Sequence, residues 1–323
     1  MPVARRGFLN LAALSVALPA FARQSRAESY PARPVHIVAG YPPGAAPDII
    51  ARLIGQALSD RLGQQFVVDN RPGAASNIGS ELVAHATPDG YTLLMTVSTN
   101  AVNATLYNNL NFDFIHDLVP VAGICSTPFL ISVTNSFPAN TVPELIAYAK
   151  ANPDKINFAT HGVGTGPHVA GELFKMMTGI TLVHVPYKGS YANDLISGQV
   201  QLTFTPIAEN IEFVRSGKLR ALAVTTAKRS AALPDVPAIG EFVPGYVAAG
   251  WYGLCAPRGT SNDIIATLAK ATLASDADPT LKSRLATLGV EPMPLDTAAF
   301  GKFITSETEK WAKVIQFSGV KPE

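Results

Sequence analysis

Cysteine and charged residues are both scarce in this chain. It has two cysteines, and Asp, Glu, Lys and Arg together make up 15% of its residues. Two cysteines exclude a fold held together by many disulfides. No block of like charge occurs, so we expect no nucleic-acid partner and no binding to an anionic membrane surface. With 47% hydrophobic residues, the 323-residue chain is long enough for two domains with separate cores.

Signature motifs of several enzyme classes are also missing. The sequence has no Gly-x-x-x-x-Gly-Lys-Ser/Thr phosphate loop, no Gly-x-Ser-x-Gly nucleophile turn and no His-Glu-x-x-His zinc motif. The stretch GVGTGP at residues 162–167 departs from the dinucleotide pattern Gly-x-Gly-x-x-Gly at Pro167. The six histidines are scattered. We therefore expect no cofactor, no metal site and no catalytic residue.

The first 27 residues differ in character from the rest. Arg5 and Arg6 precede an apolar run, Phe8 to Ala20, that is too short to span a bilayer, and small residues follow it. This pattern is typical of an export signal of the twin-arginine type, so we expect a periplasmic protein. Removing residues 1–27 removes four of the 25 basic residues, leaving 21 against 24 acidic ones, a net charge of −3. After this segment no apolar run reaches transmembrane length.

Strand-like and helix-like segments alternate along the remaining chain. Strands separated by single helices predict parallel pairing through right-handed crossovers. The first helix is expected to open at Asp48 and to end at Gly63. The expected strands are 34–41, 64–70, 91–98, 156–162, 181–187, 200–206, 219–226 and 246–257, with an apolar strand-like run at 121–133. The expected helices are 48–62, 76–86, 142–155, 167–179, 192–197, 208–216, 261–275, 278–289 and 296–317.

The three C-terminal helices have no strands of their own, so they need a sheet to cover. We therefore expect the chain to return to its first unit, with lobe one formed by residues 28–124 plus 250–323 and lobe two by residues 125–249. Two crossings between α/β lobes make a hinge that suits closure on a ligand. Cys125 and Cys255 lie near these crossings. We expect both to be buried thiols, and a disulfide between them stays open.

Two turns of the sequence have the same design. Residues 41–48 (YPPGAAPD) and 160–168 (THGVGTGPH) each join the carboxyl end of a strand to the amino end of a helix, where open α/β sheets bind ligands. The first amides of a helix lack partners, and its dipole adds about half a positive charge, so backbone alone can hold a carboxylate or phosphate. A single turn of this kind is explained by a purely structural role. Two of them, one in each lobe, predict an anion site at which the turns face each other. Glycines that would let the backbone approach a ligand are Gly44, Gly162, Gly164 and Gly166.

Longer segments resemble the Bug family, the periplasmic solute-binding receptors of tripartite tricarboxylate transporters. Besides the first turn, they are NRPGAASNIGSELVAHATPDGYTLLM, GVGTGPHVAGELF, VPYKGSYANDLISGQVQLTF, KRSAALPDVPAIGE, GWYGLCAPRGT and FITSETEKWAKVI, in family order over the whole mature chain. The resemblance implies an α/β, two-lobed type II periplasmic binding protein fold without enzymatic activity. It also implies a small carboxylate held between the lobes, often through ordered waters, and delivery to membrane permease subunits. We expect a monomer.

The resemblance also implies which residues form the site. Asp48 would cap its helix and orient a bridging water, because a carboxylate should not touch a carboxylate directly. Ala45 and Ser76 depart from the family, which commonly has glycine at both positions, and neither turn holds an arginine to clamp the ligand. The implied site residues are Tyr41, Gly44, Ala45 and Asp48 in lobe one, Gly164, Thr165, Gly166 and His168 in lobe two, and Ser76, Asn77, Ser98, Thr99 and Asn100 at the far end of the cleft.

Two other functions stay open at this point. A periplasmic hydrolase or isomerase acting on a small acid would use His168 or His161. A ligand-sensing protein would bind the same ligand but dock on a sensor kinase instead of a permease. The ligand itself stays open among C4 to C6 di- and tricarboxylates, acidic amino acids and aromatic acids.

Overall fold

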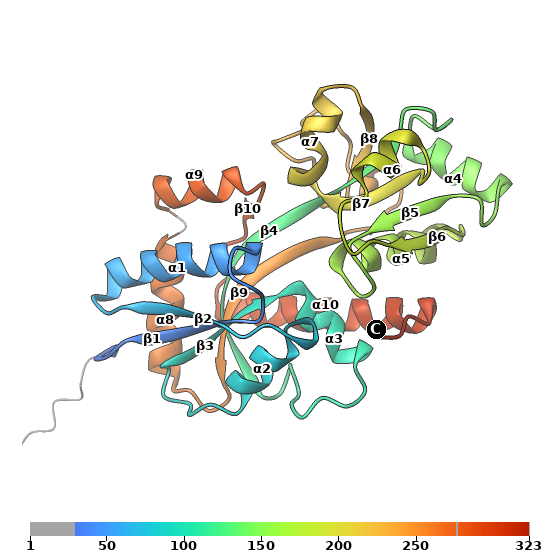
Figure 1. Cartoon of the computed structure of the whole chain (residues 1–323). Coiled ribbons are helices and arrows are strands. Elements are labelled where there is room, and N and C mark those ends of the chain that lie inside the picture. The colour runs from blue at the N-terminus through green and yellow to red at the C-terminus, as the bar shows by residue number, and fades with distance from the viewer. Residues whose placement is uncertain (1–29, 276, 323) are drawn as a thin grey trace, which may run out of the picture.

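The computed structural model describes residues 30–275 and 277–322. The export signal expected at residues 1–27 lies outside this part of the chain. Figure 1 shows two α/β lobes, as the sequence predicts, connected by the long strand β4 (Leu118–Thr134), which runs through both, and by the segment that leads into β9 (Ala249–Pro257). None of the helices within the two described ranges is long and apolar enough to cross a membrane.

Lobe one is built on a sheet with strands from both halves of the chain. β1 pairs in parallel with β2 and β3, and β9 pairs antiparallel with β3 and β4. One face of this sheet packs on α1, α8 and α9, and the other on α2, α3 and α10. The elements are β1 (Val35–Ala39), α1 (Ala46–Leu62), β2 (Phe66–Asn70), η1 (Ala74–Ser76), α2 (Asn77–Ala84), β3 (Thr92–Val97), α3 (Ser98–Leu106), β4 (Leu118–Thr134), β9 (Ala249–Pro257), α8 (Asn262–Ser275), α9 (Pro279–Thr287), β10 (Glu291–Pro292) and α10 (Thr297–Ser318).

Lobe two repeats this plan on a smaller sheet. β5 pairs in parallel with β6 and β7, while β7 and β8 both pair antiparallel with β4. A glycine in the left-handed conformation ends both α1 and α5, at Gly63 and Gly179. The elements are α4 (Val142–Ala151), β5 (Asn157–Thr160), α5 (Gly166–Thr178), β6 (Val183–Pro186), α6 (Ala192–Ser197), β7 (Leu202–Pro206), α7 (Ile207–Arg215), β8 (Leu219–Val224) and η2 (Ile239–Glu241).

The two lobes share β4, a single strand of 17 residues. Its first part pairs with β9, up to the pair formed by Pro128 and Ala249. From Phe129 onward it pairs with β7, beginning opposite Pro206. One strand therefore changes partners between two consecutive residues, and the ladder of lobe one ends where that of lobe two begins.

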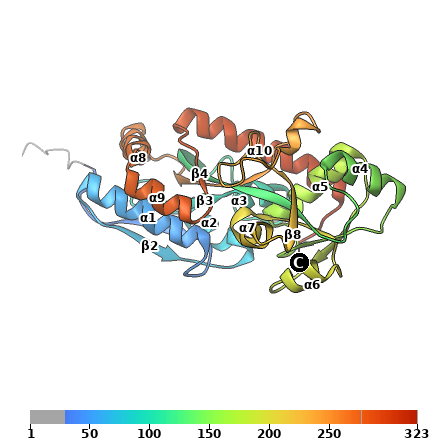
Figure 2. The same ribbon diagram turned by 90° about the horizontal axis from the view of Figure 1, so that it is seen from above.

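The C-terminal helix α10 packs against both lobes. It lies against α3 and β4 and also against α5 of lobe two, as Figures 1 and 2 show. The buried carboxylate of Glu307 accepts hydrogen bonds from the indole Nε1 of Trp311 at 3.0 Å and of Trp251, on β9, at 3.3 Å. Because both indole donors are buried, this shared acceptor ties α10 to the strand that crosses between the lobes.

Most expected elements form, but helix α3 was not predicted. Its sequence, STNAVNATL, is rich in Ser, Thr and Asn, which are poor helix formers because they compete for backbone hydrogen bonds. The side chain of Asn100 stabilises its start by accepting from the Val97 amide at 2.9 Å and donating to Ser80 Oγ at 2.9 Å. The remaining stabilisation of α3 comes from its packing against α10.

Cys125 and Cys255 lie on neighbouring strands but not opposite each other. In the β4–β9 ladder Cys125 pairs with Tyr252, whereas Cys255 pairs with Pro120. Both cysteines are buried and neither is in a disulfide, so the disulfide alternative is wrong. Burial raises the pKa of Cys255 to about 12, which makes it an unreactive thiol near neutral pH.

Candidate functional site

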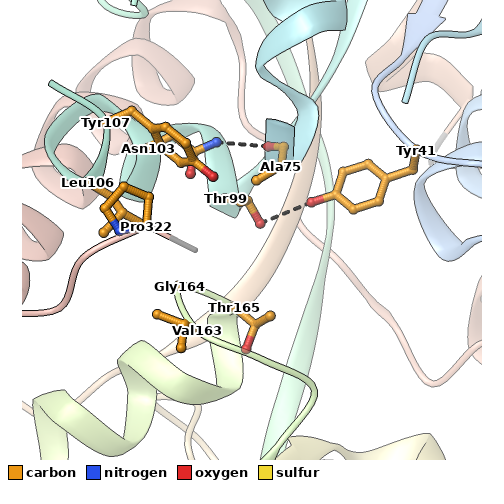
Figure 3. A pocket seen from close by; sticks show the side chains of 10 residues that line it. All are labelled: Tyr41, Ala75, Thr99, Asn103, Leu106, Tyr107, Val163, Gly164, Thr165 and Pro322. Atoms are coloured by element: carbon orange, nitrogen blue, oxygen red, sulfur yellow. Dashed lines mark hydrogen bonds between the residues drawn. The ribbon is translucent and has the colours of Figure 1, made fainter. Parts of the chain in front are cut away.

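A cavity of about 300 Å³ lies between the lobes (Figure 3). This volume is at the lower end of the range for small-molecule sites. Its walls come from the β1–α1 turn, η1, α3, the β5–α5 turn and the C-terminal tail. The lining residues are Tyr41, Ala75, Thr99, Asn103, Leu106, Tyr107, Val163, Gly164, Thr165 and Pro322.

The two turns expected to hold an anion have matching backbones. Residues 44–48 read Gly-Ala-Ala-Pro-Asp, and residues 164–168 read Gly-Thr-Gly-Pro-His. Both glycines have a positive φ, 85° for Gly44 and 74° for Gly164, and each is followed by an extended N-cap residue and a proline in the first helical turn. In each turn the glycine amide donates a hydrogen bond to the side chain four residues later. The shared design seen in the sequence is therefore a shared geometry.

In lobe one this geometry corrects the expected start of the helix. Helix α1 begins at Ala46 with Ala45 as its N-cap, not at Asp48. The first turn of the helix tolerates a proline at N2, because an N–H group at that position would have no partner within the helix. Ala45 has no side-chain acceptor, so no side chain caps the first-turn amides of α1.

Asp48 organises the first turn instead of capping its helix. Its Oδ2 accepts from the Gly44 amide at 2.8 Å, and its Oδ1 accepts from Asn70 Nδ2 and pairs with the Arg52 guanidinium, both at 2.9 Å. Burial by itself raises the pKa of this carboxyl, but the hydrogen bonds from Arg52, Gly44 and Asn70 outweigh it and leave the pKa below its ordinary value. Asp48 is thus a buried anion whose oxygens are already occupied.

In lobe two the turn lies close to α3 of lobe one. A Cβ added to Gly164 would come within 2.6 Å of Leu106 Cδ2, so that methyl group would have to shift, and the positive φ itself favours glycine. Thr165 caps α5: its Oγ1 accepts from the His168 amide at 3.4 Å and donates to the carbonyl of Gly162 at 2.8 Å. The same hydroxyl therefore closes the turn and caps the helix.

His168 holds the second turn as Asp48 holds the first. Its Nδ1 accepts the Gly164 amide at 3.0 Å, so this nitrogen carries no proton. The ring is buried and stacks on His184 with centroids 3.8 Å apart. Burial lowers the pKa of His184 to about 3. A histidine whose Nδ1 is occupied and whose ring is packed in this way positions backbone, which does not favour the hydrolase or isomerase alternative.

His161 lies in the same turn, but its side chain is paired with Glu209 and does not line the cavity. Its Nε2 lies 2.8 Å from Glu209 Oε2, and this hydrogen bond raises the pKa of His161. Glu209 also accepts from Tyr191 and Thr205. The pair fixes the β5–α5 turn to α7. In the described ranges no group of three His, Cys, Asp or Glu side chains could hold a metal ion.

The predicted residues after β3 divide into one cavity residue and two supporting ones. Thr99 lines the cavity, and its Oγ1 accepts from the hydroxyl of Tyr41 at 3.2 Å. Burial raises the pKa of Tyr41, which keeps this donor protonated. Ser98 and Asn100 are buried and do not line the cavity. The side chain of Asn100 instead stabilises the start of α3.

Ser76 and Asn77 stand just behind the cavity wall. Both are buried, and the Oγ of Ser76 packs against Gly40. Asn77 Oδ1 accepts from Nδ2 of the cavity residue Asn103 at 2.9 Å. The two residues therefore support the wall, and Asn103 is the side chain that reaches the cavity.

Four of the thirteen residues predicted for the site line the cavity: Tyr41, Thr99, Gly164 and Thr165. The remaining nine lie in the turns or behind the wall. The sequence reasoning missed Asn103, Leu106 and Tyr107 because it missed α3, and it missed Pro322 because nothing local places the tail there. An i, i+3, i+4 count from Thr99 would have put Asn103 and Leu106 on one helical face.

A cavity between two α/β lobes, with a helix N-terminus in each lobe, is typical of proteins that bind a small ligand between their lobes. The family model described as tripartite tricarboxylate transporter family receptor matches residues 50–320. The chain therefore belongs to this family of periplasmic solute-binding receptors, and the resemblance to Bug proteins is confirmed.

Known relatives match over nearly the whole length. BugT of Bordetella pertussis is 33% identical over 318 residues, which cover 97% of this chain and 98% of that protein. An R. palustris protein solved with adipate is 36% identical, with a TM-score of 0.75, covering 91% of this chain and all of that one. MatC from Rhodopseudomonas palustris with bound malate is 29% identical, with a TM-score of 0.72 and coverage of 88% and 100%. Structures of this family thus include carboxylate complexes.

Proposed function

We propose that this protein captures a small carboxylate between its lobes and delivers it to the permease subunits of a tripartite tricarboxylate transporter. The observation that carries the proposal is the pair of matching turns at residues 44–48 and 164–168, one in each lobe. Each turn brings the free amides of a helix N-terminus to a strand's carboxyl end, which suits a carboxylate. The adipate and malate complexes of the relatives support the same ligand class.

In this proposal the ligand bridges the two lobes. Lobe one comprises residues 28–124 plus 250–323, lobe two comprises residues 125–249, and closure bends β4 and β9. Asp48 and His168 do not touch the ligand but hold the two glycine amides in place. The residues at or beside the ligand are Tyr41, Gly44, Ala45, Asp48, Ser76, Asn77, Ser98, Thr99, Asn100, Gly164, Thr165, Gly166 and His168.

Export is part of the same proposal. A receptor that feeds a membrane permease works outside the cytoplasm, and the twin arginines and apolar run of residues 1–27 suit export to the periplasm. The protein acts as a monomer, binds without turnover and needs no cofactor.

The test is to identify what binds. Residues 28–323 are purified, acids that co-purify are identified by mass spectrometry, and a panel of carboxylates is screened by thermal shift. An acid present at ~100 times its Kd is expected to stabilise the protein by about 2.7 kcal/mol. The bound acid is then followed by NMR, and chemical conversion of it would overturn the proposal.

The variant His168→Asn separates binding from catalysis. An asparagine oxygen can still accept the Gly164 amide, so we expect measurable affinity and no turnover in either form. Turnover by the unchanged protein that is lost in the variant would instead support an enzyme.

A further inference from the structure

Within the described residues, no charged side chain lines the cavity. The helix N-termini beside it suit one carboxylate, but a second carboxylate deeper in the cavity would meet no cation. Burying an unpaired anion is costly, so this wall disfavours a ligand with two charged ends. Leu106, Val163 and Pro322 and the rings of Tyr41 and Tyr107 make much of the remaining lining apolar.

One buried polar group in the wall has an unused acceptor. Asn103 is 1% exposed, and its Nδ2 donates to the carbonyl of Ala75 at 2.8 Å and to Asn77 Oδ1 at 2.9 Å. These two bonds use both amide hydrogens and fix the amide orientation, because a flipped amide would set oxygen against oxygen. Asn103 Oδ1 is left with no hydrogen-bond partner among residues 30–275 and 277–322.

Figure 3 shows where this amide lies. Asn103 and Tyr107 stand on the α3 side of the cavity, and Gly164 and Thr165 stand across from them. An unpaired buried acceptor is unfavourable, so a ligand that supplies a donor recovers that free-energy cost. A ligand without a donor does not.

The backbone that orients Asn103 is itself strained. Ala74, Ala75 and Ser76 have φ values of 45°, 51° and 78°, three consecutive residues other than glycine in the left-handed region. The middle one supplies the carbonyl that accepts from Asn103. Strain of this kind persists where the surroundings require one arrangement, and it is typical of binding sites.

We propose that Asn103, oriented by Ala75 and Asn77, forms a neutral subsite that takes the hydroxyl group of a hydroxy monocarboxylate with an apolar or aromatic body. The inference rests on the proposed function, since the carboxylate end is held by the two turns. A hydroxyl donates to Asn103 Oδ1, whereas a second carboxylate would place oxygen against oxygen. The preferred ligand therefore has one charged end and one uncharged, donating end.

The test compares acids of similar shape on the unchanged protein by calorimetry. One series is benzoate, 4-hydroxybenzoate and terephthalate, and the other is hexanoate, 6-hydroxyhexanoate and adipate. In at least one series the hydroxy acid should bind about tenfold more tightly than the unsubstituted acid and the diacid. A diacid that binds most tightly in both series would overturn the subsite and leave the proposed function standing. No binding by any of the six would contradict the proposed function as well.

The variant Asn103→Ala assigns the preference to this residue. It should lose about tenfold in affinity for the hydroxy acid and change little toward the unsubstituted acid. Thr99→Val, on the same helix and also in the lining, is the matched control and should retain the preference for the hydroxy acid. Equal losses for both acids in Asn103→Ala, with circular dichroism unchanged, would overturn the assignment. The comparison on the unchanged protein stands even if the variant does not fold.

Discussion

At the scale of single residues, the two departures from the family have different physical meanings. Ser76 has φ 78°, a conformation that favours glycine, and its hydroxyl is buried against Gly40. The glycine usual at this position in the family thus suits the backbone, and serine carries strain. Ala45 has φ −71° and ψ 156°, which any residue adopts, so nothing in the backbone requires glycine there.

Ala45 matters because it is the N-cap residue of α1 but has no side-chain oxygen to accept a hydrogen bond from the first-turn amides. The corresponding residue in the other turn is Thr165, whose hydroxyl accepts from the amide three residues on. Alanine leaves the equivalent amide, that of Asp48, without a side-chain partner. In the proposed function this amide donates to the ligand carboxylate.

Replacing Ala45 by threonine is expected to trade affinity for stability. The added hydroxyl should cap α1 and raise the free energy of unfolding by about 1 kcal/mol. It should also weaken acid binding, because it occupies the Asp48 amide. Thermal denaturation without ligand and calorimetry with the best acid measure the two effects. Ala45→Val has the same shape without the hydroxyl, and equal behaviour of both variants would show a steric effect instead.

At the scale of elements, the first turn is held by a carboxylate that joins three segments. Asp48 connects the Gly44 amide of the turn, Arg52 of α1 and Asn70 of β2. Because its folded pKa lies below the ordinary value of 3.8, it contributes stability that is fully present above pH 3.8. That contribution is lost as the pH falls through the lowered pKa.

Asp48→Asn is expected to remove this contribution. Near pH 7 the variant should be less stable by about 2 kcal/mol, since hydrogen bonds to a charged group weaken. The difference between the two proteins should shrink as the pH falls below 3.8, where the carboxyl of the unfolded chain is protonated first, and it should vanish once the folded carboxyl is protonated at its lowered pKa. Urea denaturation of both proteins from pH 7 to pH 3 measures it, and a difference that does not depend on pH would contradict the role of the charge.

At the scale of the whole molecule, the lobes are connected where β4 and β9 meet the boundary between the two ladders. β4 leaves the ladder of lobe one at Pro128 and enters that of lobe two at Phe129, and β9 begins opposite the same point. The cavity lies on one side of this crossing, with lining residues from both lobes. A ligand that touches both walls therefore favours a smaller angle between them.

Small-angle X-ray scattering should detect this closure. A saturating acid is expected to lower the radius of gyration, while the secondary structure seen by circular dichroism stays constant. Scattering that does not change on binding would mean that the ligand binds without closure. A non-binding acid at the same concentration controls for the effect of added salt.

The sequence by itself determined most elements and the two turns, because these depend on neighbouring residues. Alternating apolar runs predict the strands, and the turns with glycine and proline predict two helices close to where α1 and α5 begin, although Asp48 is not the cap that the sequence suggests. The order of strands and helices also predicted the return of the chain to lobe one and the two-lobed fold. The strand and turn signals are each carried within a few residues, and the fold class follows from their order along the chain.

Only the tertiary structure decided what forms the far wall of the cavity. Helix α3 depends on packing against α10 and on the bond from Asn100 to Ser80, so its weak local preference did not predict it. The unused acceptor of Asn103 exists because Ala75, 28 residues earlier, takes one of its hydrogens. Contacts between residues far apart in sequence leave no periodic pattern, and that is why the proposed ligand preference rests on the fold and not on the sequence alone.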